Sequence, residues 1–270
     1  MCIRDSIPFL HESLDDEDEV LLALAEELGT GLVEYIGGPQ FAHLLLGPLE
    51  NLAVVEETVV REKACDSINQ LAGIMSDQQI QTFYLPLLHR LSSGEWFTSR
   101  TSAALLFASV YEKIPMSMRA DVHSMFVSLC TDETPMVRRA AARDMSALVK
   151  RMSPEVIINE MLPLYRRLSA DDQDSVRLLT VQNLVAMAEV LSPAETQQLL
   201  LSSICGAFQD KSWRVRYMAA DNFVQLATAV GEDVVKEDLV PAYINLMRDA
   251  EAEVRTAAAT QLPGLAKLLD

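Results

Sequence analysis

One repeated frame of residues runs through almost the whole chain and restricts it to one kind of architecture. In the copy at residues 210–220, an Asp is followed six residues later by an Arg that comes after a Val, and a small residue stands three positions further on. The marker arginines at this position are Arg61, Arg100, Arg138, Arg177, Arg216 and Arg255, spaced 39, 38, 39, 39 and 39 residues apart. A fixed period of this length is typical of a stacked repeat array, which has no single central core.

The second half of each copy has the pattern of an amphipathic helix. Counted from the Val before the marker, apolar or small residues recur at positions four, eight, eleven and fifteen, as in Val215, Ala219, Phe223, Leu226 and Val230. A period of 3.6 residues held over four turns predicts a helix with one buried face. The residue three after the marker is small in every copy, so a neighbouring helix can approach closely: Ala64, Ala103, Ala141, Thr180, Ala219 and Ala258.

The first half of each copy is also predicted to be helical, and it carries a proline at a shared register. These positions are Pro8, Pro48, Pro86, Pro163 and Pro241, with Ser124 and Ser202 at the two remaining ones. A proline inside a helix removes a hydrogen bond and bends the helix, whereas a proline in the first turn does neither. We favour the bend because apolar residues precede each proline by about one turn.

Each unit therefore reads as helix, short turn, helix, with Thr134 and Ser212 as candidate N-caps of second helices. One such unit cannot bury its apolar face alone, so the predicted fold is all-α, an α-α superhelix. We place seven repeats at residues 7–38, 39–76, 77–115, 116–153, 154–192, 193–231 and 232–270. Residues 1–6 do not fit the repeat and are interpreted as a leader or a translation artefact.

Composition and charge exclude several classes of function. The net charge of −17 disfavours non-specific binding to nucleic acid or anionic lipid. The four cysteines are far apart, which is typical of free thiols in a reducing compartment, and no apolar run reaches the length of a membrane span. We therefore expect a cytoplasmic location, with the nucleus as a second compartment. The four histidines are scattered and no catalytic motif is present, so we predict no catalytic residue, cofactor or metal site.

The acidic and basic residues of the frame allow two interpretations. The marker arginines could bind an acidic partner, or they could form an intramolecular ladder with the aspartates of their own or the adjacent repeat. We favour the ladder because the two residue types occur together. Its members are Asp132, Arg138, Asp171, Arg177, Asp210, Arg216, Asp249 and Arg255.

Large aromatic residues stand in the turns, where a solvated loop would normally be polar. The chain has two tryptophans, Trp96 and Trp213, and both precede a marker arginine. Phe97, Pro135 and Trp213 share one position, three residues before the marker. Because Trp and Arg dominate interface hot spots, these turns could form a protein-binding ridge in which Trp213 is exposed. The alternative is packing between adjacent turns.

A two-helix unit of this length with this frame resembles a HEAT repeat. Several segments are similar to the scaffold (A) subunit of the type 2A serine/threonine protein phosphatase, including Trp96-Phe-Thr-Ser-Arg-Thr-Ser-Ala103, Thr134-Pro-Met-Val-Arg-Arg-Ala-Ala-Ala142 and Asp210-Lys-Ser-Trp-Arg-Val-Arg-Tyr-Met218. The resemblance runs from Ile7 to Asp270 and corresponds to roughly the first half of the family's repeats.

The resemblance implies a non-catalytic scaffold whose N-terminal repeats hold regulatory B-type subunits. The positions that match the family's contacts are Trp96, Phe97, Pro135, Arg139, Ser212, Trp213 and Arg214. The family's catalytic subunit is held by C-terminal repeats that are absent here. The alternative function is a HEAT-type transport or adaptor protein that carries basic cargo on an acidic concave face. The net charge permits this alternative, whereas the tryptophans in the turns argue against it.

Overall fold

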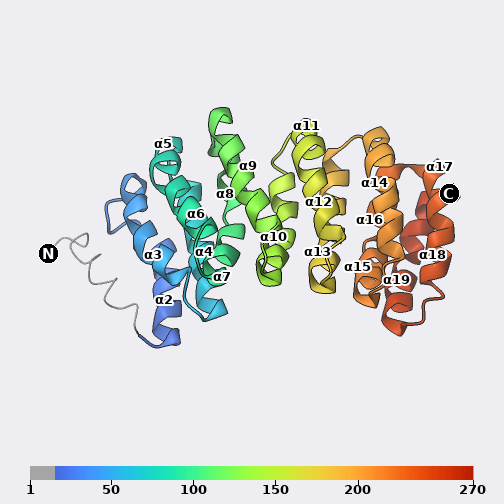
Figure 1. Ribbon diagram of the computed structural model, residues 1–270, viewed down its shortest axis with the longest axis horizontal. Helices are drawn as coiled ribbons and strands as arrows, with labels where there is room; N and C mark the ends of the chain where they lie inside the picture. The colour runs from blue at the N-terminus through green and yellow to red at the C-terminus, as the bar shows by residue number, and fades with distance from the viewer. Residues whose placement is uncertain (1–15, 270) are drawn as a thin grey trace. The chain divides into compact units, whose positions relative to one another are not determined.

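The computed structural model describes residues 16–269, and all regular secondary structure in that range is helical (Figure 1). The predicted all-α repeat fold is therefore confirmed. Residues 1–6, interpreted as a leader, and Pro8 lie outside the described residues. The chain forms two compact units, residues 1–141 and 142–270, and the division falls within α10 (Pro135–Val149). None of the helices in the described range has the length and apolar character that a membrane span requires.

The first unit is built from helical hairpins. Its first-position helices are a 3₁₀ segment, Pro39–Leu45, with α3 (Leu46–Leu52), α5 (Asp77–Gln79) with α6 (Leu85–Ser92), and α9 (Met116–Cys130). Its second-position helices are α2 (Asp18–Gly29), α4 (Thr58–Ile74), α7 (Phe97–Ala104) with α8 (Phe107–Val110) and the 3₁₀ turn Tyr111–Lys113, and α10. Second helices of successive repeats pack together, as α2 does against α4.

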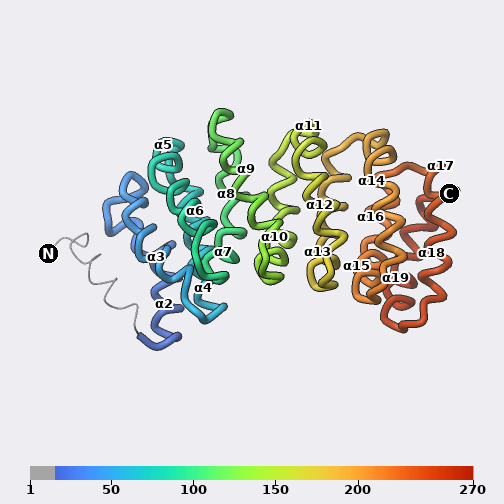
Figure 2. The backbone as a smooth tube through the Cα atoms, in the orientation of Figure 1, coloured from blue at the N-terminus to red at the C-terminus, as the bar shows by residue number. Residues whose placement is uncertain are grey.

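The second unit repeats the same plan. Its first helices are α11 (Pro154–Val156) with α12 (Leu162–Ser169), α14 (Pro193–Phe208), and α17 (Glu232–Val234) with α18 (Val240–Leu246). Its second helices are α13 (Asp174–Val190), α15 (Trp213–Asp221) with α16 (Phe223–Val230), and α19 (Ala252–Leu269). Figure 2 follows the backbone through the short reversals between them, for example from α12 to α13.

The apolar stripe of each second helix forms the core, as its period requires. Val215, Ala219 and Phe223 are at most 3% exposed in α15 and α16. The small residues at the shared register are all buried, and Thr180 is the largest of them. Close contact between neighbouring second helices therefore depends on this register.

Three of the register prolines lie within a first helix and follow a π-helical turn. The π turns are Ile80–Tyr84, Ile157–Met161 and Val235–Leu239. The residue before each proline donates its N–H to the carbonyl five residues earlier: Leu85 to Ile80, Leu162 to Ile157 and Val240 to Val235. Because a proline has no N–H and its ring crowds the preceding turn, a widened turn lets the helix continue through it. Pro48 instead lies in the first turn of α3, the position that was the alternative to a bend inside the helix.

Candidate functional site: the turns between paired helices

Every marker arginine folds back onto the turn of its own repeat. The Arg177 Nη1 atom donates hydrogen bonds to the carbonyls of Asp171 at 2.8 Å and Asp172 at 3.2 Å. The same pair of bonds, at 2.5–3.5 Å, is made by Arg61, Arg100, Arg138, Arg216 and Arg255. We call this arrangement the arginine clasp. It satisfies carbonyls that follow the end of a first helix, where the helix itself supplies no donor.

The aspartate of the frame closes the same turn from the other side. The Asp210 Oδ1 atom accepts the backbone N–H of Ser212 at 2.7 Å. The equivalent bonds join Asp132 to Thr134, Asp171 to Gln173 and Asp249 to Glu251, at 2.8–3.0 Å. An aspartate that bonds the N–H two residues on is a standard way to fix a tight turn.

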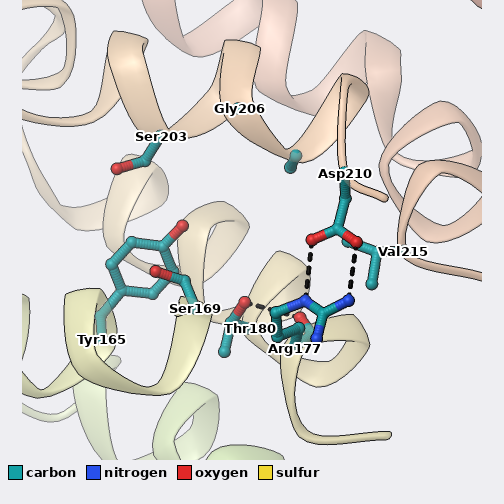
Figure 3. A pocket seen from close by; sticks show the side chains of 9 residues that line it. Tyr165, Ser169, Arg177, Thr180, Ser203, Gly206, Asp210 and Val215 are labelled. Carbon is teal, nitrogen blue, oxygen red and sulfur yellow. Dashed lines mark hydrogen bonds and ion pairs between the residues drawn. The ribbon is translucent and has the colours of Figure 1, made fainter. Parts of the chain in front are cut away.

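The aspartate also pairs with the marker arginine of the preceding repeat. Arg177 donates from Nε and Nη2 to the two oxygens of Asp210, both at 2.9 Å (Figure 3). The same two-pronged pair joins Arg100 to Asp132 at 2.6 and 3.1 Å, and Arg216 to Asp249 at 2.6 and 2.9 Å. In these pairs the aspartate side chain bonds the arginine of the neighbouring repeat, while its own arginine takes the backbone carbonyl.

The pairs keep their charges. The hydrogen bond from Arg216 is the main cause that lowers the pKa of Asp249. Burial raises the pKa of Asp210, but the hydrogen bonds from Arg177 and the Ser212 N–H outweigh it and leave that pKa below its usual value. The hydrogen bond with Asp210 raises the pKa of Arg177. We infer a structural role for these pairs, because both side chains are largely buried and each neutralises the other.

In the first unit, the turns also carry apolar side chains that face solvent. Trp96 precedes α7 and is 73% exposed, and Phe97 is its first residue and is 37% exposed. Pro135 opens α10 and is exposed. The sequence reasoning missed two residues of this surface, Val59 at 55% and Met136 at 52% exposure. Both are apolar residues two positions before a marker arginine, which is the signal that could have identified them.

Arg139 lies one residue beyond the marker Arg138 in α10. It is exposed and makes no ion pair with any residue that the structure describes. We call the exposed side chains of Val59, Trp96, Phe97, Pro135, Met136 and Arg139 the turn ridge. The ridge combines an aromatic anchor, apolar neighbours and one unpaired cation, the composition that favours a protein interface.

In the second unit, the residues predicted to bind a partner are already engaged with one another. The guanidinium of Arg214 lies over the Trp213 ring at 5.3 Å, and Trp213 is half-buried. The expectation that Trp213 is free is therefore wrong: it occupies the register of Phe97, one residue closer to the helix than Trp96.

Ser212 also differs from its prediction. It precedes α15 but makes no capping bond, and its hydroxyl donates to Asp174 Oδ2 at 2.9 Å. Arg214 Nη1 donates to the same oxygen at 3.4 Å. The bond from Ser212 is the main cause that lowers the pKa of Asp174. Sequence reasoning missed Asp174, because the sequence of one repeat does not indicate which of its residues accepts hydrogen bonds from the next repeat.

Two of the histidines, His43 and His123, occupy packing positions. The His43 ring stacks on Phe83 with centroids 4.1 Å apart, and a ring nitrogen of His123 lies 2.8 Å from the Tyr111 hydroxyl. Over the range that the structure covers, no three His, Cys, Asp or Glu side chains come together as a metal site would require. What the turns offer chemically is a surface for non-covalent binding.

Comparison with known proteins shows which repeats and which relatives the chain resembles. Residues 232–270 match the model of the PPP2R1A-like HEAT repeat, and residues 200–230 match the HEAT repeat. The A-type regulatory subunit of protein phosphatase PP2A from Schizosaccharomyces pombe is 49% identical over 164 residues, which are 60% of this chain and 28% of that protein. The beta isoform of the human 65 kDa A-type regulatory subunit is 53% identical over 146 residues, 53% of this chain and 24% of that protein.

A third relative is the protein phosphatase 2A scaffold subunit of Dictyostelium discoideum, 46% identical over 59% of this chain and 27% of that protein. Among solved structures, Kap121p superimposes with a TM-score of 0.72 at 14% identity, covering 98% of this chain and 29% of that one. A likeness at this identity concerns the fold alone. The chain spans about a quarter of the length of the curated relatives it matches. Over somewhat more than half of its length, the chain is therefore similar to A-type regulatory subunits, or scaffold subunits, of protein phosphatase 2A, and its last repeats match HEAT-repeat models.

Proposed function

We propose that this chain serves as a non-catalytic scaffold of a protein phosphatase 2A holoenzyme, and that its turn ridge holds a regulatory B-type subunit. The names of the relatives support the scaffold role. One structural observation carries the docking site: Trp96 is 73% exposed at a turn, with Phe97 beside it. Leaving a tryptophan in water is unfavourable, so a partner that covers it would gain binding energy.

The mechanism we propose is positioning. A scaffold that holds an enzyme together with a substrate-recruiting subunit raises the effective concentration of one near the other, without contributing chemistry of its own. Helices held by clasps and ion pairs suit this role, because a partner then meets a surface that is already ordered and loses less conformational entropy on binding.

We propose that the turn of the second unit, which also matches the family's contacts, binds the regulatory subunit as well. Ser212, Trp213 and Arg214 are already bonded to Asp174 or to one another. A partner there would meet a preformed group in which Arg214, 59% exposed at its side chain, offers the accessible charge. We propose that Trp96 contributes more to binding than Trp213, because more of its surface remains to be covered.

We propose that other repeats of the family scaffold hold the catalytic subunit, and that residues 16–269 do not bind it directly. The runner-up function, transport of basic cargo on an acidic face, draws support from the net charge of −17. The relatives near 50% identity favour the phosphatase scaffold, since they are named as regulatory or scaffold subunits of that phosphatase.

The test is a calorimetric titration of this chain with a purified B-type regulatory subunit of protein phosphatase 2A. Trp96→Ala should weaken binding by about 2 kcal/mol, close to thirtyfold in Kd. The matched control is Met116→Ala: Met116 is 80% exposed but begins α9, at the end of the hairpin opposite the turn. This control should leave the affinity within about twofold of the wild-type value.

Two results would count against the proposal. Equal affinities of the Trp96→Ala and Met116→Ala chains would remove the turn ridge as the docking site. A tight complex with the isolated catalytic subunit would contradict the assignment of that subunit to other repeats. Circular dichroism of each variant establishes that a loss of binding does not reflect unfolding.

A further inference from the structure

A polar cavity lies in the second unit between two consecutive repeats (Figure 3). Its volume is about 190 Å³, and its walls come from α12, α13, α14 and the turn that leads into α15. The residues that line it are Tyr165, Ser169, Arg177, Thr180, Ser203, Gly206, Ala207, Asp210 and Val215. At roughly 30 Å³ per molecule, the space equals that of about six waters.

The cavity lies where this repeat carries smaller side chains than two earlier repeats do at the same registers. Ser203 stands at the register of Leu87 and Leu164, which are buried in their own repeats. Gly206 stands at the register of Arg90 and Arg167, and a Cβ atom added to it would meet nothing within 4 Å. Two substitutions toward smaller side chains on one helix have therefore opened the interface between the repeats.

Tyr165 directs its hydroxyl into this space. The side chain is 1% exposed, and Figure 3 shows its hydroxyl between Ser203 and Ser169. Burial raises the pKa of Tyr165 to about 12, and side-chain hydrogen bonds with Ser203 and Ser169 moderate the rise. Tyr243, at the same register, donates to the Ala258 carbonyl at 2.7 Å. At Tyr165 the partners are instead hydroxyls of Ser203 and Ser169, which line the cavity themselves, so a ligand in the cavity can exchange hydrogen bonds with them.

The donors and acceptors of the wall define the chemistry of that ligand. Ser169 and Thr180 donate their protons to the carbonyls of Arg166 and Arg177, at 3.1 and 2.7 Å, so they present acceptors to the cavity. The hydroxyls of Tyr165 and Ser203 bond each other, and a ligand in the cavity can accept a proton from either one in place of that bond. Arg177 and Asp210 neutralise each other, so the wall carries no net charge. A carboxylate would bring a second negative charge toward Asp210 and would offer no donor.

We propose that this cavity binds a neutral carboxamide, supplied by a glutamine or asparagine side chain of a protein docked on the adjacent turns. A carboxamide has two N–H donors for Ser169 and Thr180 and one carbonyl that accepts from Tyr165 or Ser203. The cavity is reached past Gly206, which is exposed, and it borders the turn of Trp213. A group this small gains little affinity alone, but delivery by a partner already bound nearby makes its insertion effectively intramolecular. The choice of source rests on the proposed scaffold function.

The chemistry of the cavity is tested first, with propionamide as the probe and amide and tyrosine-ring NMR signals as the readout. Saturable shifts are expected at Gly206, Ala207 and Tyr165, with a Kd on the order of ten millimolar. Ser203→Leu, which introduces the residue that stands at this register as Leu87 and Leu164, should weaken binding at least tenfold. The matched control Ser202→Leu changes an exposed neighbour and should bind as wild type does. Tyr165→Phe keeps the shape but loses the buried hydroxyl, and it should also bind at least tenfold more weakly.

Three results would overturn the carboxamide site: no saturable shift, equal titrations of the Ser203→Leu and wild-type chains, or propionate binding as well as propionamide. A competition experiment then identifies the source. A bound regulatory subunit should suppress the propionamide shifts at Gly206. If that subunit binds and leaves the shifts intact, the assignment of the carboxamide to this partner is wrong, while the scaffold proposal stands. If it does not bind at all, the scaffold proposal fails and the propionamide titration alone decides the cavity's chemistry.

Discussion

The interfaces at Arg61 and at Arg177 each join two consecutive repeats, but they do so with different side chains. Arg61 and Arg177 are 7% and 4% exposed, and each clasps two carbonyls of its own turn. Arg177 also meets Asp210 of the next repeat, whereas the position facing Arg61 is Gly94. The remaining arginine donor there goes to the Thr58 hydroxyl at 3.1 Å.

Hydroxyl groups replace the ion pair at the Arg61 interface. Thr98 donates to the Val54 carbonyl at 3.1 Å, and Ser102 donates to the Ala53 carbonyl at 2.6 Å. A Cβ atom on Gly94 would lie 2.4 Å from the Ser99 hydroxyl, so no aspartate fits without a shift. The comparison separates two functions of the frame: the clasp builds each turn, and the link between repeats is a second device that can be exchanged.

The largest effect is expected when both devices are lost together. Arg177→Ala removes the clasp and leaves Asp210 largely buried without its cation, which should lower the free energy of unfolding by about 3 kcal/mol. Urea denaturation followed by circular dichroism measures it. Arg177→Lys keeps the charge without the two-pronged geometry, so its free energy of unfolding should lie between those of wild type and Arg177→Ala. A melt of Arg177→Ala that coincides with wild type would show that the pair is only a solvated surface feature.

Arg61→Ala sharpens the contrast because it removes the clasp alone. No carboxylate is left uncompensated, so we expect a loss of about 1–2 kcal/mol, smaller than that of Arg177→Ala under the same conditions. The comparison of the two interfaces fails if Arg61→Ala proves the more destabilising change.

The two interfaces should also respond differently to acid. The folded-state pKa values of Asp132, Asp210 and Asp249 lie below their usual value. The stability they contribute is therefore present above the unfolded pKa, near 3.9, and is lost as the pH falls through the lower folded values. Unfolding free energies measured down the acid range should decline less steeply for Asp210→Asn than for wild type. Arg61→Ala should keep the wild-type dependence, and equal slopes for all three chains would refute this account.

The smallest effect on stability concerns the two tryptophans. Trp96→Ala should change the unfolding free energy by less than about 0.5 kcal/mol, because that side chain is mostly in water. Trp213→Ala should cost about 1 kcal/mol, since it loses buried surface and the contact with Arg214. Thermal melts compare them directly, and the reverse order would show that Trp96 is the packing residue.

The helices and their hairpin pairing could be predicted from the sequence. The 3.6-residue apolar stripe recurs in each copy, and a small residue such as Ala219 stands three positions after each marker arginine. The links between repeats were harder to predict. Pairing Arg177 with the next aspartate rather than with its own depends on how far one repeat is displaced from the next, which no single repeat encodes. The Ser212 hydroxyl donates to Asp174 of the preceding repeat, while Asp210 accepts the Ser212 N–H.

The cavity beside Tyr165 was not foreseen for a similar reason. Ser203 and Gly206 look like ordinary polar positions on a surface helix, and only the side chains of the neighbouring repeat show that they leave a space unfilled. The π turns before Pro86 and Pro163 could not be predicted from the sequence either. The sequence indicated a disturbance at the register, but the choice between a bend and a widened turn depends on backbone geometry.

The turn ridge as a docking surface is the central functional claim, and hydrogen exchange of the chain with and without a regulatory subunit tests it most directly. The amides of residues 94–98 and 134–139 should gain protection in the complex, while those of residues 114–118, at the opposite end of α9, should exchange as in the free chain. Protection confined to residues 114–118, or spread along the second helices with the turns unchanged, would contradict the claim.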